Sequence, residues 1–235
     1  DTVSKKGAHA QIIEEMRTGE ADFLVGTQMI AKGHDLHSVT LSAILDADIG
    51  LHLPDFRASE NSYHLLTQAA GRAGRGEKPG RVIIQTREPD HPSIVALTTN
   101  RFLAFARYEL DFREQLRYPP WVRMLRIIIS SENQSNALEA AQMLADEART
   151  LSGSLEDPSQ KVISIQSAAS GVTILGPAPA PIEKISNRFR YHLILKAQSP
   201  STLSRFSRYF YERKYKFPKK LDIRLTVDLD PQSIM

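Results

Sequence analysis

The sequence predicts an α/β domain built on a parallel sheet, followed by an α+β domain with a split βαβ order. Two observations lead to this prediction. The first part of the chain alternates helical segments with short β-branched segments, and the second part runs strand, helix, strand, strand, helix, strand. Between them a helical stretch ends at residues 118–121, Tyr-Pro-Pro-Trp, because proline cannot donate to the helical hydrogen-bond ladder. We expect domains at residues 1–96 and 118–235, joined by a helical linker at 97–117.

Helical and β-branched segments follow one another in the first domain. A helix over residues 7–17 is expected to end at Gly19, since glycine favours helix C-termini. The other expected elements are strands at 22–25 and 40–45, a helix at 59–70 and a strand at 81–86. This alternation is typical of parallel sheets with helices on their faces, where ligands bind beyond the carboxyl ends of the strands.

A long helix is predicted at residues 93–116, with polar residues along one side. Behind the two prolines, the pattern predicts six elements in the order of a ferredoxin-like split motif. These are a strand at 124–129, a helix at 136–151, strands at 172–175 and 191–195, a helix at 201–211 and a strand at 223–227. Residues 161–165 are ambiguous, and an insertion is one interpretation of them.

The composition is ordinary for a globular protein of one or two domains: 235 residues, 41% hydrophobic and 24% charged. No apolar run approaches the roughly 20 residues that span a bilayer, and the first residues do not resemble a signal peptide, so we expect no membrane association. The chain has no cysteine, which excludes disulfides and thiolate zinc sites and suits a cytoplasmic protein. The seven histidines lack metal-ligand spacing, so we expect no metal site.

The formal net charge is only +3, but positive residues gather in the second domain. Residues 181–220 hold eleven Lys and Arg against two acids, a local charge of +9. Such an asymmetry indicates an anionic partner, of which nucleic acid is the commonest, although a solvated basic face has the same composition. Aromatic residues are interleaved, so unpaired bases could stack there while phosphates are neutralised. Several of these aromatic residues must instead fill the core of the domain, and for any single one we expect the core role. The candidate DNA-binding residues here are Arg188, Arg190, Arg213, Lys214 and Lys216.

Residues 68–76, Gln-Ala-Ala-Gly-Arg-Ala-Gly-Arg-Gly, place two arginines three positions apart among three glycines. Such a segment can be a flexible basic linker, or it can hold guanidinium groups against a phosphate, whose oxygens they bind in pairs. Here it follows a predicted helix and precedes a predicted strand, which favours phosphate binding in a packed domain. A second segment, residues 26–35 (Gly-Thr-Gln-Met-Ile-Ala-Lys-Gly-His-Asp), follows the strand predicted at 22–25. Its glycines allow close backbone approach, and Thr27 and Gln28 offer hydrogen bonds to phosphate or sugar.

Together these two segments resemble motifs V and VI of superfamily-two helicases, which lie in the second of their two RecA-like lobes. The resemblance to the PriA family of primosomal helicases extends over nearly the whole chain. It is carried by residues 1–7, 26–35, 45–48, 53–60, 68–76, 118–121 and 227–231. The resemblance implies a partial RecA-like lobe of the P-loop NTPase type. It also implies a DNA-dependent ATPase that moves 3′ to 5′ and restarts replication at stalled or branched forks.

The same resemblance implies roles for individual residues. Arg72 and Arg75 would face ATP held on the other lobe, and at least one of them would act as an arginine finger on the γ-phosphate. Asp46 and Asp48 are not interpreted as magnesium ligands, because they stand in the wrong lobe; we expect them to lie at the end of a strand and to cap a turn. The residues near the nucleotide would be Gly33, Asp35, Gln68 and Gly71, and those near DNA would include Thr27, Gln28 and Lys32.

Two parts of the family's pattern do not occur in this sequence: a Gly-x-x-x-x-Gly-Lys-[Ser/Thr] loop and a cysteine-rich zinc module. We therefore interpret the chain as the C-terminal part of a larger helicase that binds ATP and magnesium, with zinc only in the cysteine-rich module. The isolated chain is expected to lack ATPase activity. The expected partners are branched or single-stranded DNA, single-strand-binding protein, other primosome proteins and the N-terminal part of the same helicase. The alternative is a non-catalytic module that docks DNA or protein, including an acidic protein tail; a self-sufficient phosphate-transfer enzyme is disfavoured, because no general base stands beside the arginines.

Overall fold

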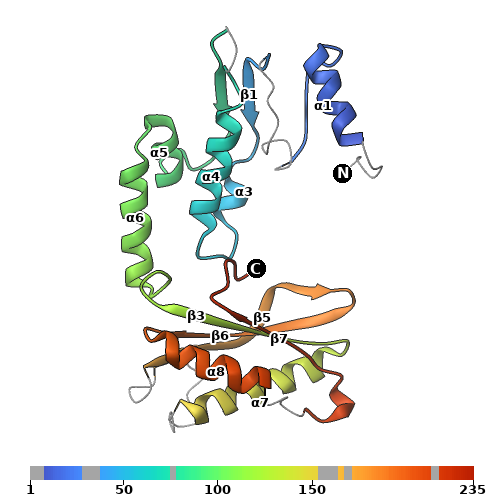
Figure 1. Cartoon of the computed structure of the whole chain (residues 1–235), viewed down its shortest axis with the longest axis vertical. Helices are drawn as coiled ribbons and strands as arrows, with labels where there is room; N and C mark the ends of the chain where they lie inside the picture. The colour runs from blue at the N-terminus through green and yellow to red at the C-terminus, as the bar shows by residue number, and fades with distance from the viewer. Residues whose placement is uncertain (1–7, 28–37, 75–77, 153–163, 167–170, 213–216) are drawn as a thin grey trace. The chain divides into compact units, whose positions relative to one another are not determined.

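The computed structural model describes residues 8–27, 38–74, 78–152, 164–166, 171–212 and 217–235. The chain divides into two compact units, whose elements are labelled in Figure 1. The first unit extends to Glu109, and the second extends from Leu110 to Met235. Pro54–Phe56 belong to the second unit, although their neighbours in sequence belong to the first.

The first unit combines a two-stranded parallel sheet with helices. Its elements are α1 (Ala8–Thr18), β1 (Leu41–Ile44), α3 (Asp48–Leu51), α4 (Ala58–Ala70), β2 (Arg81–Ile84), α5 (Pro92–Thr99) and the first part of α6 (Phe102–Gln115). α4 packs against β1 and α5, and its Leu66 lies in a small core with Ala47 and Ile94. The parallel pairing of β1 with β2 is the arrangement that the alternation of helices and strands predicts.

The strand predicted at residues 22–25 does not form. Its apolar side chains are open to solvent, with Phe23 86% and Val25 90% exposed. A short apolar segment becomes a buried strand only where a neighbouring strand supplies its hydrogen bonds and a helix covers its face. Within the described ranges no strand pairs with residues 22–25, so this prediction was wrong.

The single helix predicted at residues 93–116 is two helices, α5 and α6. Asn100 ends α5 in the left-handed region at φ 54°, and the Arg101 amide donates to the Ala96 carbonyl oxygen at 2.9 Å. Asparagine tolerates this conformation better than most residues, which makes it a common helix C-cap. The predicted stop before the prolines is confirmed, since α6 ends at Gln115.

The second unit contains a five-stranded antiparallel sheet with the strand order β4-β5-β6-β3-β7. Helices α7 and α8 lie on one face of this sheet (Figure 1). The elements are β3 (Arg123–Ser131), α7 (Gln134–Leu151), β4 (Ser164–Gln166), β5 (Val172–Ile185), β6 (Arg188–Ala197), α8 (Pro200–Glu212), a 3-10 turn (Lys219–Leu221) and β7 (Arg224–Leu229). The predicted order of strands and helices is confirmed, and β4 is an additional edge strand that overlaps the ambiguous segment.

The core of the second unit lies between the sheet and its two helices. Alternate residues of β3 face the helices and are fully buried: Leu125, Ile127 and Ile129. α7 presents small residues to them, which lets the helix approach the sheet closely: Ala137, Ala140, Ala141, Ala145 and Ala148. α8 contributes larger side chains at helical spacing: Leu203, Phe206 and Phe210. The intervening residues of β3 and β6 point to the opposite face of the sheet.

Strands β5 and β6 form a hairpin that is longer than predicted. They join through Ser186 and Asn187, whose φ values of 48° and 61° belong to a tight two-residue turn. Prolines cannot donate to a strand ladder, and the hairpin accommodates them with two register shifts. Arg188 and Arg190, which were expected to precede the strand at 191–195, therefore lie inside β6.

Candidate nucleotide and nucleic-acid site

The arginine-bearing turn directly follows α4. One face of α4 is buried through residues spaced four apart: Ala58, Ser62 and Leu66. On another face, Gln68 follows His64, and their Nε2 atoms lie 2.9 Å apart. Arg72, which is half-buried, stands four residues after Gln68. Helical spacing therefore places His64, Gln68 and Arg72 along one side of the helix and its extension.

Backbone hydrogen bonds continue α4 into a tight turn at residues 71–74. The Arg72 amide donates to the Ala69 carbonyl oxygen at 3.2 Å, and the Gly74 amide donates to the Val39 carbonyl oxygen at 3.0 Å. Val39 precedes β1, so the turn lies at the amino ends of the parallel strands. The rule for parallel sheets favours the carboxyl ends as ligand sites. The arginine turn does not follow that rule, because α4 returns antiparallel to β1 and ends where the strand begins.

Two glycines allow this turn to pack closely against the start of β2. Gly74 has φ 78°, and a Cβ atom placed there would lie 2.6 Å from the Gly80 amide nitrogen. A Cβ atom at Gly80 would clash with the Gly74 amide nitrogen in turn. Larger residues at either position would push the turn away from the sheet. The glycines thus fix the backbone that carries Arg72.

The carboxyl end of the small sheet is capped by Asp48, which is buried. Its carboxylate accepts hydrogen bonds from the Thr86 hydroxyl and from the Arg87 amide, the latter at 2.8 Å. These bonds, the one from Thr86 foremost, lower the pKa of Asp48 below its ordinary value. Asp46, with φ 52°, forms the bend between β1 and α3. Both oxygens of Asp48 are used within the chain, which matches the predicted capping role.

Many of the predicted site residues lie outside the described residues: Gln28, Lys32, Gly33, Asp35, Arg75, Arg213, Lys214 and Lys216. Of the others in the first unit, Thr27 is exposed, and Gly71 donates its amide to the Thr67 carbonyl oxygen at 3.0 Å. The structure thus brings Gln68, Gly71 and Arg72 together at the end of α4.

In the second unit, Arg188 and Arg190 have different environments although both belong to β6. The Arg188 guanidinium is buried, and its Nη1 donates to Asp222 Oδ2 at 2.7 Å. Its Nη2 donates to the carbonyl oxygens of Asp222 (2.6 Å) and Ser130 (3.0 Å). Arg190 is half-buried, and its Nη1 donates to the Ile182 carbonyl oxygen at 3.1 Å. Arg188 therefore connects β3, β6 and the segment before β7, and both of its Nη atoms are occupied within the chain.

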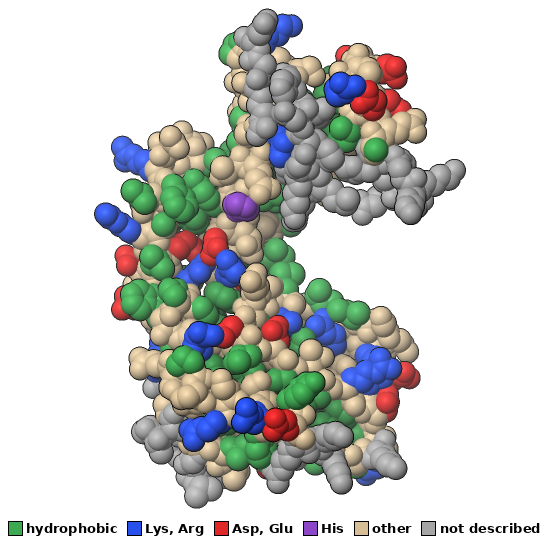
Figure 2. Space-filling model, viewed as in Figure 1, with side chains coloured by type: hydrophobic (Ala, Val, Ile, Leu, Met, Phe, Trp, Pro, Cys, Tyr) green, Lys and Arg blue, Asp and Glu red, His purple; other side chains and the backbone are tan. Residues whose placement is uncertain are grey.

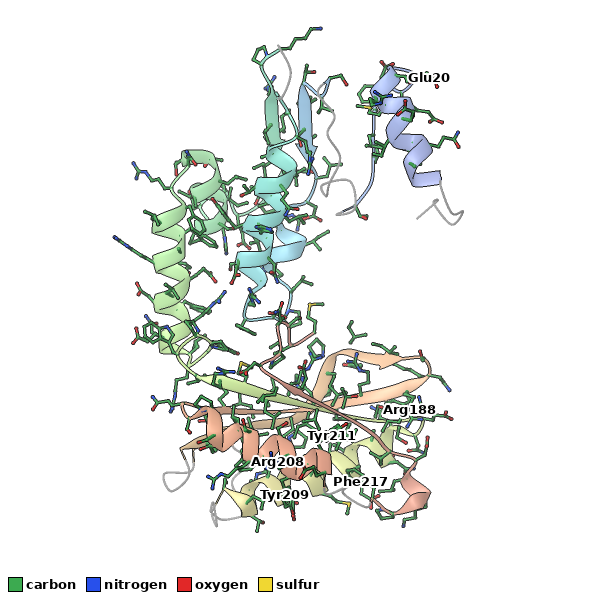
Figure 3. The ribbon with its side chains drawn as sticks, in the orientation of Figure 1. Glu20, Arg188, Arg208, Tyr209, Tyr211 and Phe217 are labelled. Atoms are coloured by element: carbon green, nitrogen blue, oxygen red, sulfur yellow. The ribbon has the colours of Figure 1, made fainter. Side chains whose placement is uncertain are left out.

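The outward side of α8 carries exposed polar and aromatic side chains (Figure 3). Tyr211 is 77% exposed, and the Arg208 guanidinium lies 3.5 Å from the Glu212 carboxylate (Nε to Oε1). Tyr209 instead turns toward α7, where its hydroxyl donates to the Glu147 carboxylate. Arg205, Arg208, Tyr209 and Glu212 line a shallow depression on this side.

Sequence reasoning missed two basic residues on the sheet face opposite the helices, Arg126 of β3 and His192 of β6. Arg126 Nη1 donates to the carbonyl oxygens of Ser233 (3.0 Å) and Met235 (2.7 Å). Burial, and then the charges of Arg126 and Arg190, lower the pKa of His192. The sequence did contain a sign that Arg126 has a special role, because it is the one charged residue in the apolar run 124–129.

Lys196 of β6 is also buried, against an aromatic pair. Its Nζ lies 3.4 Å from the centroid of the Tyr118 ring and donates to the Leu116 carbonyl oxygen at 3.2 Å. Phe56 stacks on Tyr118 with ring centroids 5.3 Å apart, and Arg113 lies 5.5 Å from the centroid of Phe56. Burial is the main cause that lowers the pKa of Lys196 from 10.5 to about 8. The second unit thus holds an aromatic pair that contacts two cations.

Among the residues with described positions, no group of histidines and carboxylates could hold a metal ion. In the same part of the chain, every helix is too short or too polar to cross a membrane.

The chain matches two known families. Residues 4–77 match the helicase conserved C-terminal domain, and residues 114–232 match the primosomal protein N C-terminal domain. The chain is 36% identical over 235 residues to replication restart protein PriA of Bacillus subtilis, which covers 100% of the chain and 27% of that protein. The protein of the same name from Synechocystis is 40% identical over 199 residues, which cover 85% of the chain and 22% of that protein. The one from Haemophilus influenzae is 33% identical over 234 residues, which cover 100% of the chain and 30% of that protein. The chain thus spans less than a third of the length of these relatives.

Proposed function

The chain belongs to the PriA family of replication restart proteins, and on that premise we propose that it is the C-terminal part of an ATP-dependent DNA helicase. The whole protein moves 3′ to 5′ along DNA, recognises stalled or branched forks and restarts replication through primosome assembly. This part supplies the arginine half of an ATP site and a surface that binds DNA or protein.

The two units correspond, in this proposal, to part of a RecA-like second lobe and to a ferredoxin-like C-terminal domain. The parallel pairing of β1 with β2 and the position of α4 support the first assignment. The antiparallel order β5-β6-β3-β7, with two helices on one face, supports the second. We place the domains at residues 1–96 and 118–235, with the linker at 97–117.

The observation that carries the ATP-site proposal is the turn at residues 71–74. Its backbone is fixed by hydrogen bonds to α4 and to Val39, so Arg72 extends from a rigid position. A preorganised guanidinium can stabilise charge on the γ-phosphate without reorganising during the reaction. Arg72 and Arg75 therefore take the arginine-finger role toward ATP and magnesium bound on the other lobe. Gly33, Asp35, Gln68 and Gly71 complete the nucleotide edge.

DNA contacts come from both units. In the first unit they are Thr27, Gln28 and Lys32. In the second they are Arg190, Arg213, Lys214 and Lys216, with Arg205 and Arg208 added on the outward side of α8. Because phosphates dominate such contacts, the affinity for DNA should fall steeply as salt rises.

Other partners follow from the same proposal. They are single-strand-binding protein, further primosome proteins and the N-terminal part of the same helicase, which carries the phosphate loop and the cysteine-rich zinc module. The protein acts in the cytoplasm. The isolated chain does not hydrolyse ATP, because it has no phosphate-cradling loop.

ATP hydrolysis by the full-length protein tests the proposal. Arg72→Ala and Arg75→Ala should each lower kcat by roughly 10³-fold or more with little loss of DNA affinity, since an arginine finger acts mainly on the transition state. Lysine at either position should not restore the rate, because a point charge lacks the planar fork. Arg17→Ala is the matched control, an exposed arginine of α1 paired with Glu14 at 2.5 Å. Near-normal turnover in both alanine variants would show that the arginine role is wrong.

A second candidate function is a docking module without a part in catalysis, which the exposed side of α8 favours. In that case the alanine variants would keep full ATPase activity, while Arg205→Ala with Arg208→Ala would weaken DNA or protein binding. The two candidates therefore predict opposite results for ATP hydrolysis by Arg72→Ala and Arg75→Ala, whereas Arg205→Ala with Arg208→Ala weakens binding in both.

A further inference from the structure

The sheet face opposite α7 and α8 carries a line of three basic side chains. Arg126 lies on β3, and Arg190 and His192 lie two residues apart on β6. Register places His192 opposite Ile128, two residues beyond Arg126, so His192 stands between the two arginines. Strand geometry puts its backbone roughly 7 Å from each of theirs. Figure 2 shows Lys and Arg side chains on the surface of this unit beside the β5–β6 hairpin.

Among the residues that the structure describes, these three side chains have no acidic partner. The ion pairs of the described residues include neither arginine of this line nor His192. The acid opposite Arg126 in register is Asp228 of β7, which forms no ion pair with it, and β7 also adds Arg224 to this face. Asp55 accepts hydrogen bonds from the segment that Arg126 contacts, at Ser233 and Ile234. Positive charge therefore remains in excess on this face.

Two buried nitrogens in this line have no hydrogen-bond partner in the described part of the chain: Arg126 Nε and His192 Nδ1. Buried polar atoms are nearly always paired in proteins, so two unpaired nitrogens on neighbouring strands indicate a place for an acceptor. Burial, and then the charge of Arg126, also lower the pKa of Arg190, as they do for His192. Like charges held together in a half-buried site are costly, and a bound anion would offset that cost.

We propose that Arg126, His192 and Arg190 bind a backbone phosphate of DNA on this face of the sheet. The inference rests on the proposed DNA-binding function and identifies the surface that contacts the DNA strand. Guanidinium groups bind phosphate oxygens in pairs, and the imidazole between them adds a third donor. Contacts to the backbone carry no sequence information, so the site serves binding by DNA structure rather than by sequence.

Binding of labelled forked DNA by the full-length protein at several salt concentrations tests this site. Arg190→Gln should weaken binding to all sequences alike and reduce the slope of log affinity against log salt by about 1. Arg190→Lys should keep the slope, because it keeps the charge. Arg123→Gln is the matched control: it removes a charge from the same sheet, but its guanidinium already pairs with Asp230. Thermal melting of each variant checks that it folds.

Each outcome has a distinct meaning. If the wild type binds DNA and Arg190→Gln keeps its affinity and slope, the phosphate site is wrong while DNA binding stands. If the wild type does not bind DNA, the proposed DNA-binding function fails and this site with it. If Arg190→Gln weakens binding of an acidic peptide but not of DNA, the face belongs to a protein partner. If inorganic phosphate at constant ionic strength stabilises the wild type but not Arg190→Gln, and DNA affinity is equal in both, the site takes a free anion instead.

Discussion

Removing the charge of Lys196 should change how folding stability depends on pH. Burial foremost lowers the pKa of this lysine from 10.5 to about 8 in the folded chain. One pKa unit corresponds to about 1.4 kcal/mol, so the charged side chain destabilises the folded state by up to about 3 kcal/mol at neutral pH. The Tyr118 ring and the Leu116 carbonyl oxygen offset part of this, which makes the figure an upper bound. Because the folded pKa lies below the unfolded one, the penalty is fully present below about pH 8 and is relieved as the pH rises toward 10.5.

Urea denaturation of the wild type and of Lys196→Met at about pH 7 and about pH 9.5 measures this effect. Over that range the wild type should gain up to about 2 kcal/mol of unfolding free energy relative to the variant. Lys184→Met is the matched control, since Lys184 is exposed and its Nζ also lies over an aromatic ring, 4.5 Å from the centroid of Phe189. A difference between wild type and Lys196→Met that stays constant with pH would refute the reasoning.

Three further predictions concern stability. Gly74→Ala should destabilise the first unit by roughly 2 kcal/mol or more. Gly19→Ala should cost only about 1 kcal/mol, because Gly19 has a similar φ of 81° but nothing lies within 4 Å of the added Cβ. Equal losses of stability in thermal melting would contradict the close packing of the turn. Arg188→Met should lower the unfolding free energy by about 1–3 kcal/mol, because it removes hydrogen bonds to two partly buried carbonyl groups, and a folded variant that loses DNA affinity would return Arg188 to the DNA surface. Asp48→Asn should reduce the loss of stability on acidification. The pKa of Asp48 is lower in the folded chain, so its carboxylate stabilises the fold at pH values above the ordinary pKa, and this stability is lost as the pH falls through the folded pKa. An unchanged acid transition would contradict this.

Local sequence patterns predicted the elements whose apolar periodicity or β-branched composition is strong on its own. α4 and β2 formed as expected because apolar spacing and β-branched residues decide them locally. Residues 22–25 have the same local pattern, but a strand also needs a partner, and that depends on tertiary structure. The predicted helix 93–116 is interrupted at Asn100, whose left-handed conformation ends α5. A single asparagine is a weaker signal than the apolar periodicity on either side of it.

The candidate site was predictable where periodicity alone decides it. Gln68 and Arg72 share one side of α4 and its extension because they are four residues apart. The different environments of Arg188, which is buried, and Arg190, which is half-buried, could not be predicted in the same way. They depend on the register of β6, which the turn at residues 186–187 sets, and on the position of Asp222 far along the chain.

The arginine-finger role is tested most directly by the affinity of the full-length protein for ADP with aluminium fluoride, which mimics the transferred γ-phosphate, compared with its affinity for ATP. A group that acts on the transition state should contribute to binding of the mimic and little to binding of the ground state. Arg72→Ala and Arg75→Ala should therefore weaken binding of the mimic by on the order of 10³-fold and leave ATP affinity within a few-fold of the wild type. Equal affinities of wild type and both variants for the mimic, or equal losses for the mimic and ATP, would contradict an arginine finger in this chain.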